Sequence, residues 1–135
     1  MKKTSIVIAA FILIMATGCS NNNPKAAAQK FLTAFTNGDN TTVTQMITKD
    51  SQTFWEKYKE EVDYASRIIN KPKDEKDTYI FKDGQVKGDF STQTFIGITI
   101  IPSQGKNDTT TVPVSLTKEN GKWKVMLQNT FNNIK

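Results

Sequence analysis

The chain has 135 residues, with 18 lysines and arginines against 13 acidic residues, no histidine and one cysteine. This length fits one domain, and the lack of histidine removes the commonest general base and the commonest metal ligand. Charges of both signs are interleaved along the chain, which argues against a nucleic-acid surface. We therefore predict no metal site, no cofactor and no nucleic-acid partner.

The first eighteen residues have the layout of a secretory signal. Lys2 and Lys3 precede an apolar run, residues 6–15, and three small residues follow the run before Cys19. At about 1.5 Å per residue, the run covers only about half of a hydrocarbon core of roughly 30 Å. The run is too short to span a membrane as a permanent helix, so we predict that residues 1–18 are a signal peptide.

The segment Ala16-Thr17-Gly18-Cys19 resembles the lipobox of bacterial lipoproteins, although that family usually has Leu at the position of Ala16. The resemblance implies that Cys19 carries a diacylglycerol and becomes the mature N-terminus. Two or more acyl chains hold a protein stably on a membrane. We expect a lipid-anchored protein on the extracytoplasmic face of the cell membrane, with residues 19–23 as lipidated cysteine and polar tether, and one domain at 24–135.

Three helices are predicted after the tether. Asn23 can cap the first helix, Pro24 suits its first position and Gly38 its left-handed stop. Asp39 can cap a second, short helix. Residues 52–69 have apolar side chains at alternating spacings of three and four, which predicts one long amphipathic helix. A loop at 70–77 ends the helical half of the chain.

About five strands are predicted after residue 77. Residues 78–82 and 85–90 flank Asp83-Gly84, which is a hairpin turn signal. The third strand, residues 93–101, places its isoleucines 96, 98 and 100 on one face, with Gly97 as a candidate kink or bulge. The fourth strand is residues 110–119 and the fifth is 122–129.

Two local signals refine the last strands. Asn120-Gly121 predicts a two-residue turn between the fourth strand and the fifth. Pro113 lies inside the fourth strand, so that strand should be an edge there or carry a bulge. Helices that precede an antiparallel sheet predict an α+β domain with the helices packed on one face of the sheet.

Two stretches, "PKAAAQKFLTAFTNGDNTTVTQMIT" and "ENGKWKV", resemble the small lipoproteins of the NTF2-like (cystatin-like, cone-shaped) superfamily, the group with a DUF4878 or lumazine-binding-like domain. The residues that match its patterns are Phe31, Leu32, Ala34, Gly38, Asp39, Gly121, Trp123, Lys124 and Val125. The resemblance covers roughly residues 24–130. It implies a strongly curved sheet wrapped around a long helix, often enclosing a cavity. No catalytic motif of that superfamily's enzymes matches this chain.

Candidate functional residues are of two kinds. Carboxylates would have to carry any catalysis, but a solvated helix or strand surface explains them better, because charged residues are mostly exposed; they are Glu56, Glu60, Glu61, Asp63, Asp77 and Asp89. Aromatic residues at core-facing spacings are candidates for lining a ligand cavity, because such cavities are mostly apolar. The speculative cavity residues are Trp55, Tyr58, Tyr64, Tyr79 and Phe95.

The sequence thus predicts a non-enzymatic, membrane-anchored module that binds a small apolar ligand or an envelope protein. One alternative is an enzyme that uses a cavity carboxylate as acid or base. The other is an exclusion or immunity lipoprotein of the phage or plasmid type, with which small size and a lipid anchor are compatible.

Overall fold

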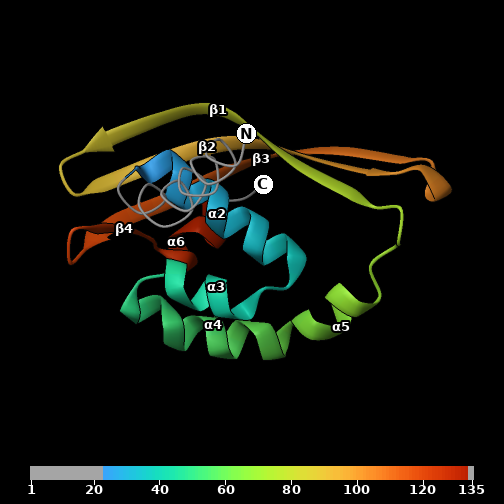
Figure 1. Ribbon diagram of the computed structural model, residues 1–135, viewed down its shortest axis with the longest axis horizontal. Coiled ribbons are helices and arrows are strands. Elements are labelled where there is room, and N and C mark those ends of the chain that lie inside the picture. The colour runs from blue at the N-terminus through green and yellow to red at the C-terminus, as the bar shows by residue number, and fades with distance from the viewer. Residues whose placement is uncertain (1–22, 134–135) are drawn as a thin grey trace, which may run out of the picture.

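The structure is a computed structural model that describes residues 23–133. The predicted signal peptide and Cys19 lie outside the described residues. Within them, five α-helices and one four-stranded antiparallel sheet form an α+β arrangement, as predicted. All of these helices lie on one side of the sheet (Figure 1).

The first helical hairpin begins and ends where its caps predict. In α2 (Pro24–Asn37), the Asn23 side chain accepts hydrogen bonds from the backbone N–H groups of Lys25 and Ala26. Gly38 follows with φ of 75°, the left-handed conformation that ends the helix. The Asp39 side chain accepts from the Thr42 N–H and caps α3 (Asn40–Met46). Both predicted caps are confirmed. Each involves only residues that are close to it in the sequence, which is why the sequence reveals it.

The predicted long helix is two helices, so the prediction of one helix over 52–69 was wrong. Its first part is α4 (Lys49–Glu61) and its second is α5 (Tyr64–Ile69). They meet at Asp63, which has φ of 48°, a conformation that Asp tolerates better than most residues. The break turns Tyr64 inward, where its hydroxyl donates to the Phe35 carbonyl. The apolar spacing continues across the break, so periodicity alone does not reveal it.

Four strands form the sheet, and they lie in the order β1-β2-β3-β4. Their bounds are β1 (Lys76–Lys87), β2 (Phe90–Ile101), β3 (Lys106–Glu119) and β4 (Lys122–Val125), with a 3₁₀ turn η1 (Pro102–Gln104) between β2 and β3. The prediction of about five strands was wrong at both ends of the sheet. The first two predicted strands are one, and the last is shorter than expected.

Asp83-Gly84 is not a hairpin turn, because both residues lie inside β1 and pair with Thr94 and Gln93. The register shifts between Phe81 and Asp83, where β1 has a bulge. A Cβ atom at Gly84 would clash with the Gln93 side chain. Gly84 therefore leaves space for the buried Gln93 side chain on the next strand. From the sequence alone, a glycine with this role cannot be told from a glycine in a turn.

The chain after Val125 is helical, which corrects the prediction of a strand over 122–129. Helix α6 (Leu127–Asn133) packs against β3 and α4. The Ser51 hydroxyl accepts a hydrogen bond from the Leu127 N–H at 3.0 Å, and the Thr130 hydroxyl accepts from the Ser115 N–H at 3.0 Å. These tertiary bonds satisfy the backbone N–H groups of Leu127 and Ser115 where the strand pairing of β4 ends.

Of the three remaining predictions for the sheet, two are confirmed and one is wrong. Asn120 and Gly121 have φ of 53° and 77°, which confirms the two-residue turn. At Pro113, β3 pairs only with β2 among the described residues, so the predicted edge is confirmed. Gly97 carries no bulge, because its register with Tyr79 and Thr110 is continuous.

Candidate functional site

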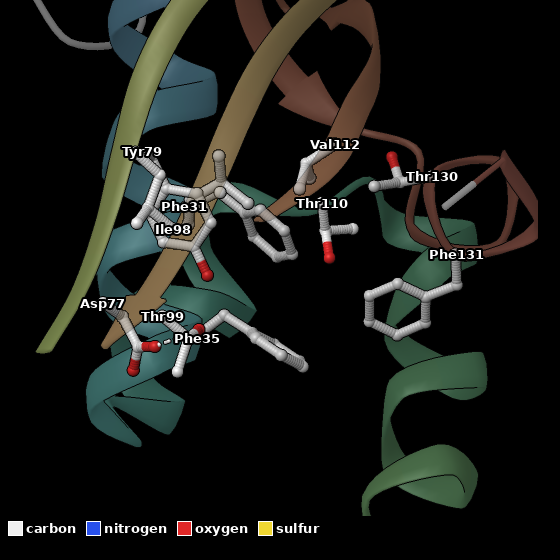
Figure 2. Close-up of a pocket in the computed structure, with 12 residues that line it drawn as sticks. Phe31, Phe35, Asp77, Tyr79, Ile98, Thr99, Thr110, Val112, Thr130 and Phe131 are labelled. Carbon is white, nitrogen blue, oxygen red and sulfur yellow. Dashed lines mark hydrogen bonds between the residues drawn. The ribbon is translucent and has the colours of Figure 1, made fainter. Parts of the chain in front are cut away.

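A cavity of about 220 Å³ lies between the helix-covered face of the sheet and helices α2 and α6 (Figure 2). We call it the inner cavity. Its apolar walls come from α2, β2, β3 and α6; they are Phe31, Leu32, Phe35, Ile98, Val112 and Phe131. Its polar groups come from all three long strands and from α6; they are Asp77, Tyr79, Thr99, Thr110 and Thr130. Apolar walls with a few polar groups are typical of small-molecule sites.

A second, more open cavity of about 350 Å³ adjoins the first. The two share Phe35, Asp77 and Tyr79 as walls. Helix α5 and the following loop cover its other side, through Tyr64, Ile68 and Lys71 among others. We call the two cavities together the cleft, in which an apolar interior leads to a polar mouth.

A group of three charged side chains forms the polar mouth. Asp77 accepts a hydrogen bond from the Thr99 hydroxyl at 2.7 Å, and its other oxygen lies 2.5 Å from Lys71 Nζ. The same Nζ lies 3.1 Å from Glu75 and donates to the Thr36 carbonyl at 3.5 Å. The three charged side chains are only 14–25% exposed. Lys71 thus joins the loop after α5 to β1 and to the end of α2.

Two tyrosines contribute neutral hydroxyl groups to the cleft. Tyr79 Oη lies 2.7 Å from the Thr36 hydroxyl, and burial raises the pKa of Tyr79. Burial also raises the pKa of Tyr64, to about 12. Both hydroxyls keep their protons at neutral pH, so each is able to donate a hydrogen bond.

We expect stability to fall between pH 10 and pH 12, because the pKa of Tyr64 is about 12 in the folded protein against an ordinary value of 10.0. In that window the unfolded chain has lost the Tyr64 proton and the folded chain has kept it, so rising pH favours unfolding. Urea denaturation at a series of pH values measures the decline. Tyr64→Phe removes the titrating group and should make the decline shallower; an equally steep decline in this variant would contradict the assignment.

The structure separates the predicted cavity residues. Tyr79 lines both cavities, and Tyr58 and Tyr64 line the open one. Trp55 and Phe95 are both 0% exposed and belong to the hydrophobic core instead of the cleft walls. Helical and strand periodicities mark a side chain as inward-facing but do not say whether it meets another side chain or an empty space.

The candidate carboxylates are also divided. Asp77 reaches the inner cavity, whereas the other five are exposed; they are Glu56, Glu60, Glu61, Asp63 and Asp89. Sequence analysis missed Lys71 and Glu75 as site residues because the loop at 70–77 reads as a solvated, charged segment. It missed Phe131 because the helix that carries it was predicted to be the end of a strand.

Comparisons of the chain with protein-family models, curated proteins and solved structures yield no match. None of the helices among residues 23–133 has the length and apolar character needed to cross a membrane. The described part of the chain also holds no group of three or more acidic, His or Cys side chains placed to share a metal ion.

Proposed function

We propose that this protein is a lipid-anchored, extracytoplasmic binding module of the NTF2-like type whose cleft holds a small, mostly apolar ligand. The observation that carries the proposal is the inner cavity of about 220 Å³ with its aromatic walls. An apolar cavity of about 150 Å³ is large enough for benzene. The inner cavity therefore has room for one ring and several further carbon atoms.

The polar groups favour a ligand without a net charge. Lys71 already pairs with both Glu75 and Asp77, so an anionic head group would have to break an existing ion pair. The Tyr79 and Thr36 hydroxyls share one hydrogen bond, in which either can donate, and this leaves one hydroxyl proton for a ligand. An alcohol, a phenol or an amide with an apolar body fits this arrangement.

Gly97→Val should lower ligand retention at least about tenfold, since filling an apolar site removes the space for ligand carbons. A Cβ atom at Gly97 would already lie 3.3 Å from the Tyr79 ring and 3.4 Å from Val112, both of which line the inner cavity. The measurement is native mass spectrometry of the full chain extracted from its own membrane, with quantitation of the retained molecule. Circular dichroism checks that the variant is folded.

Thr111→Val is the matched control, because it adds a β-branched apolar side chain on the next strand, at an exposed position. It should retain the ligand as the unchanged protein does. Equal retention by Gly97→Val would exclude the inner cavity as the binding site. Retention of a protein instead of a small molecule would favour an envelope partner.

Asp77 supports a second candidate function. A carboxylate among aromatic side chains in a cavity wall is the arrangement that an acid or base catalyst requires. Here both of its oxygens are engaged, by Thr99 and by Lys71, which favours a structural anion over a free base. Incubating the recovered molecule with the protein separates the candidates. An unchanged molecule supports binding, and conversion to a product supports an enzyme.

A further inference from the structure

The chain between α4 and β1 crosses the open side of the cleft. It consists of α5 and the residues that follow it, and it runs from the helical layer up to the sheet (Figure 1). We call residues 64–73 the strap. Its inward side lines the open cavity through Tyr64, Ile68 and Lys71. Because the open cavity shares three walls with the inner cavity, the space under the strap leads to the inner cavity.

Both ends of the strap are fixed to the body of the protein. At its start, the Tyr64 side chain is buried, and its hydroxyl donates to the Phe35 carbonyl. Directly after its end, the Asp74 carboxylate accepts hydrogen bonds from the Ser103 N–H at 2.7 Å and from the Ser103 hydroxyl at 2.9 Å. Movement of the strap is therefore confined to the residues between these two points.

The middle of the strap has few buried contacts. Of the six residues of α5, Tyr64 alone is buried, and Ile69 is 80% exposed. The Ile68 side chain is partly buried, against Gly38 and the edge of the core. The Asp63 side chain does not cap the first turn of α5. A helix this short has little stability of its own, and segments with few buried contacts open at a low cost in free energy.

Lys71 supplies the polar contacts that hold the middle of the strap in place. Its Nζ lies 2.5 Å from Asp77 and 3.1 Å from Glu75, and it donates to the Thr36 carbonyl at 3.5 Å. All three partners lie outside the strap. Asp77 is also a wall of both cavities, so the ion pair of Lys71 lies where one cavity passes into the other.

We infer that the ligand enters and leaves the inner cavity under the strap, and that the ion pairs of Lys71 hold this passage closed. The inference rests on the ligand-binding cleft of the proposed function and adds a route and a gate to it. A gate sets how often the passage is open, and it leaves the fit of the closed site to the ligand as it was. Loss of the Lys71 charge should therefore speed entry and release by the same factor. A residue that only contacts the ligand would change release alone.

The test compares the full chain with Lys71→Met and Lys73→Met, each in lipid nanodiscs. Methionine removes the charge and keeps an unbranched side chain. Lys73 is the matched control, because it is exposed in the same segment and forms no ion pair among the described residues. The probe is para-fluorobenzamide, a neutral amide with one ring, and nanodiscs without protein correct for its partition into lipid. Fluorine NMR exchange spectroscopy gives the entry and release rates.

Lys71→Met should raise both rates roughly fivefold, the factor that one partly exposed ion pair contributes, and should keep the dissociation constant within about twofold. Lys73→Met should match the unchanged protein. Lys71→Arg, which keeps the positive charge, should restore the slow rates. Hydrogen exchange of the strap amides should be faster in Lys71→Met than in Lys73→Met, with the amides of β2 and β3 unchanged in both.

The possible results separate the gate from the cleft on which it rests. A probe that binds with the same rates in all the proteins would overturn the gate and leave the inner cavity as the site. A weaker affinity of Lys71→Met with an unchanged entry rate would make Lys71 a contact of the ligand and overturn the gate. Equal hydrogen exchange of the strap in Lys71→Met and Lys73→Met would overturn it as well. A probe that binds to none of the proteins would overturn both the proposed small-molecule site and the gate.

Discussion

Replacing Trp55 by alanine should lower the free energy of unfolding by about 3–5 kcal/mol. The Trp55 side chain is 0% exposed and is the largest fully buried side chain in the described part of the chain. Its ring centre lies 5.1 Å from that of Tyr64, 5.8 Å from Phe35 and 6.2 Å from Tyr58. Alanine would leave a cavity where α4, α5 and α2 meet. Urea denaturation followed by circular dichroism measures the loss.

Trp55→Phe separates the contribution of aromatic packing to the free energy of unfolding from the contribution of the indole N–H. Trp55 Nε1 is buried and has no hydrogen-bond partner among the described residues. An unsatisfied buried N–H costs free energy, so its removal offsets part of the lost packing. We expect Trp55→Phe to cost less than half as much as Trp55→Ala. A cost equal to that of alanine would show that the indole N–H has a partner, such as a buried water.

Local sequence signals predicted those parts of the fold that depend on neighbouring residues. The caps at Asn23 and Asp39 and the turn at Asn120-Gly121 each involve residues within a few positions of one another. Gly84 failed as a signal because its role is set by Gln93 on the adjacent strand. Helix α6 was missed for the same reason, since its first N–H bonds to Ser51, on α4.

The cleft was predicted less well than the fold. Tyr79 was found because a buried tyrosine needs a hydroxyl partner, and Thr36 supplies it. Trp55 and Phe95 have the same inward spacing but meet other side chains instead of an empty space. The pairing of Lys71 with Asp77 depends on how the loop after α5 turns back toward β1. Charge alone gives no reason to place these two residues in a cavity wall.

The packing of Trp55 and the cleft are physically connected through Phe35. Phe35 lies in contact distance of Trp55, Tyr64 and Phe131, and it is a wall of both cavities. The Phe35 carbonyl also accepts a hydrogen bond from the Tyr64 hydroxyl, and this bond holds α5 against α2. Loss of the indole would therefore loosen the wall of the cleft as well as the core. Trp55→Ala should reduce ligand retention along with stability, whereas Gly97→Val should reduce retention alone.

Changing Cys19 to alanine should abolish acylation and leave an unprocessed precursor that still carries residues 1–18. On the proposed lipid anchor the thioether requires the sulfur atom, so the alanine variant has no atom that can carry the diacylglycerol. Labelling with a radioactive fatty acid and the mass of the N-terminal peptide measure the two effects. Ser20→Ala, one residue further on, is the matched control and should be labelled normally. Continued labelling of Cys19→Ala would rule out the anchor.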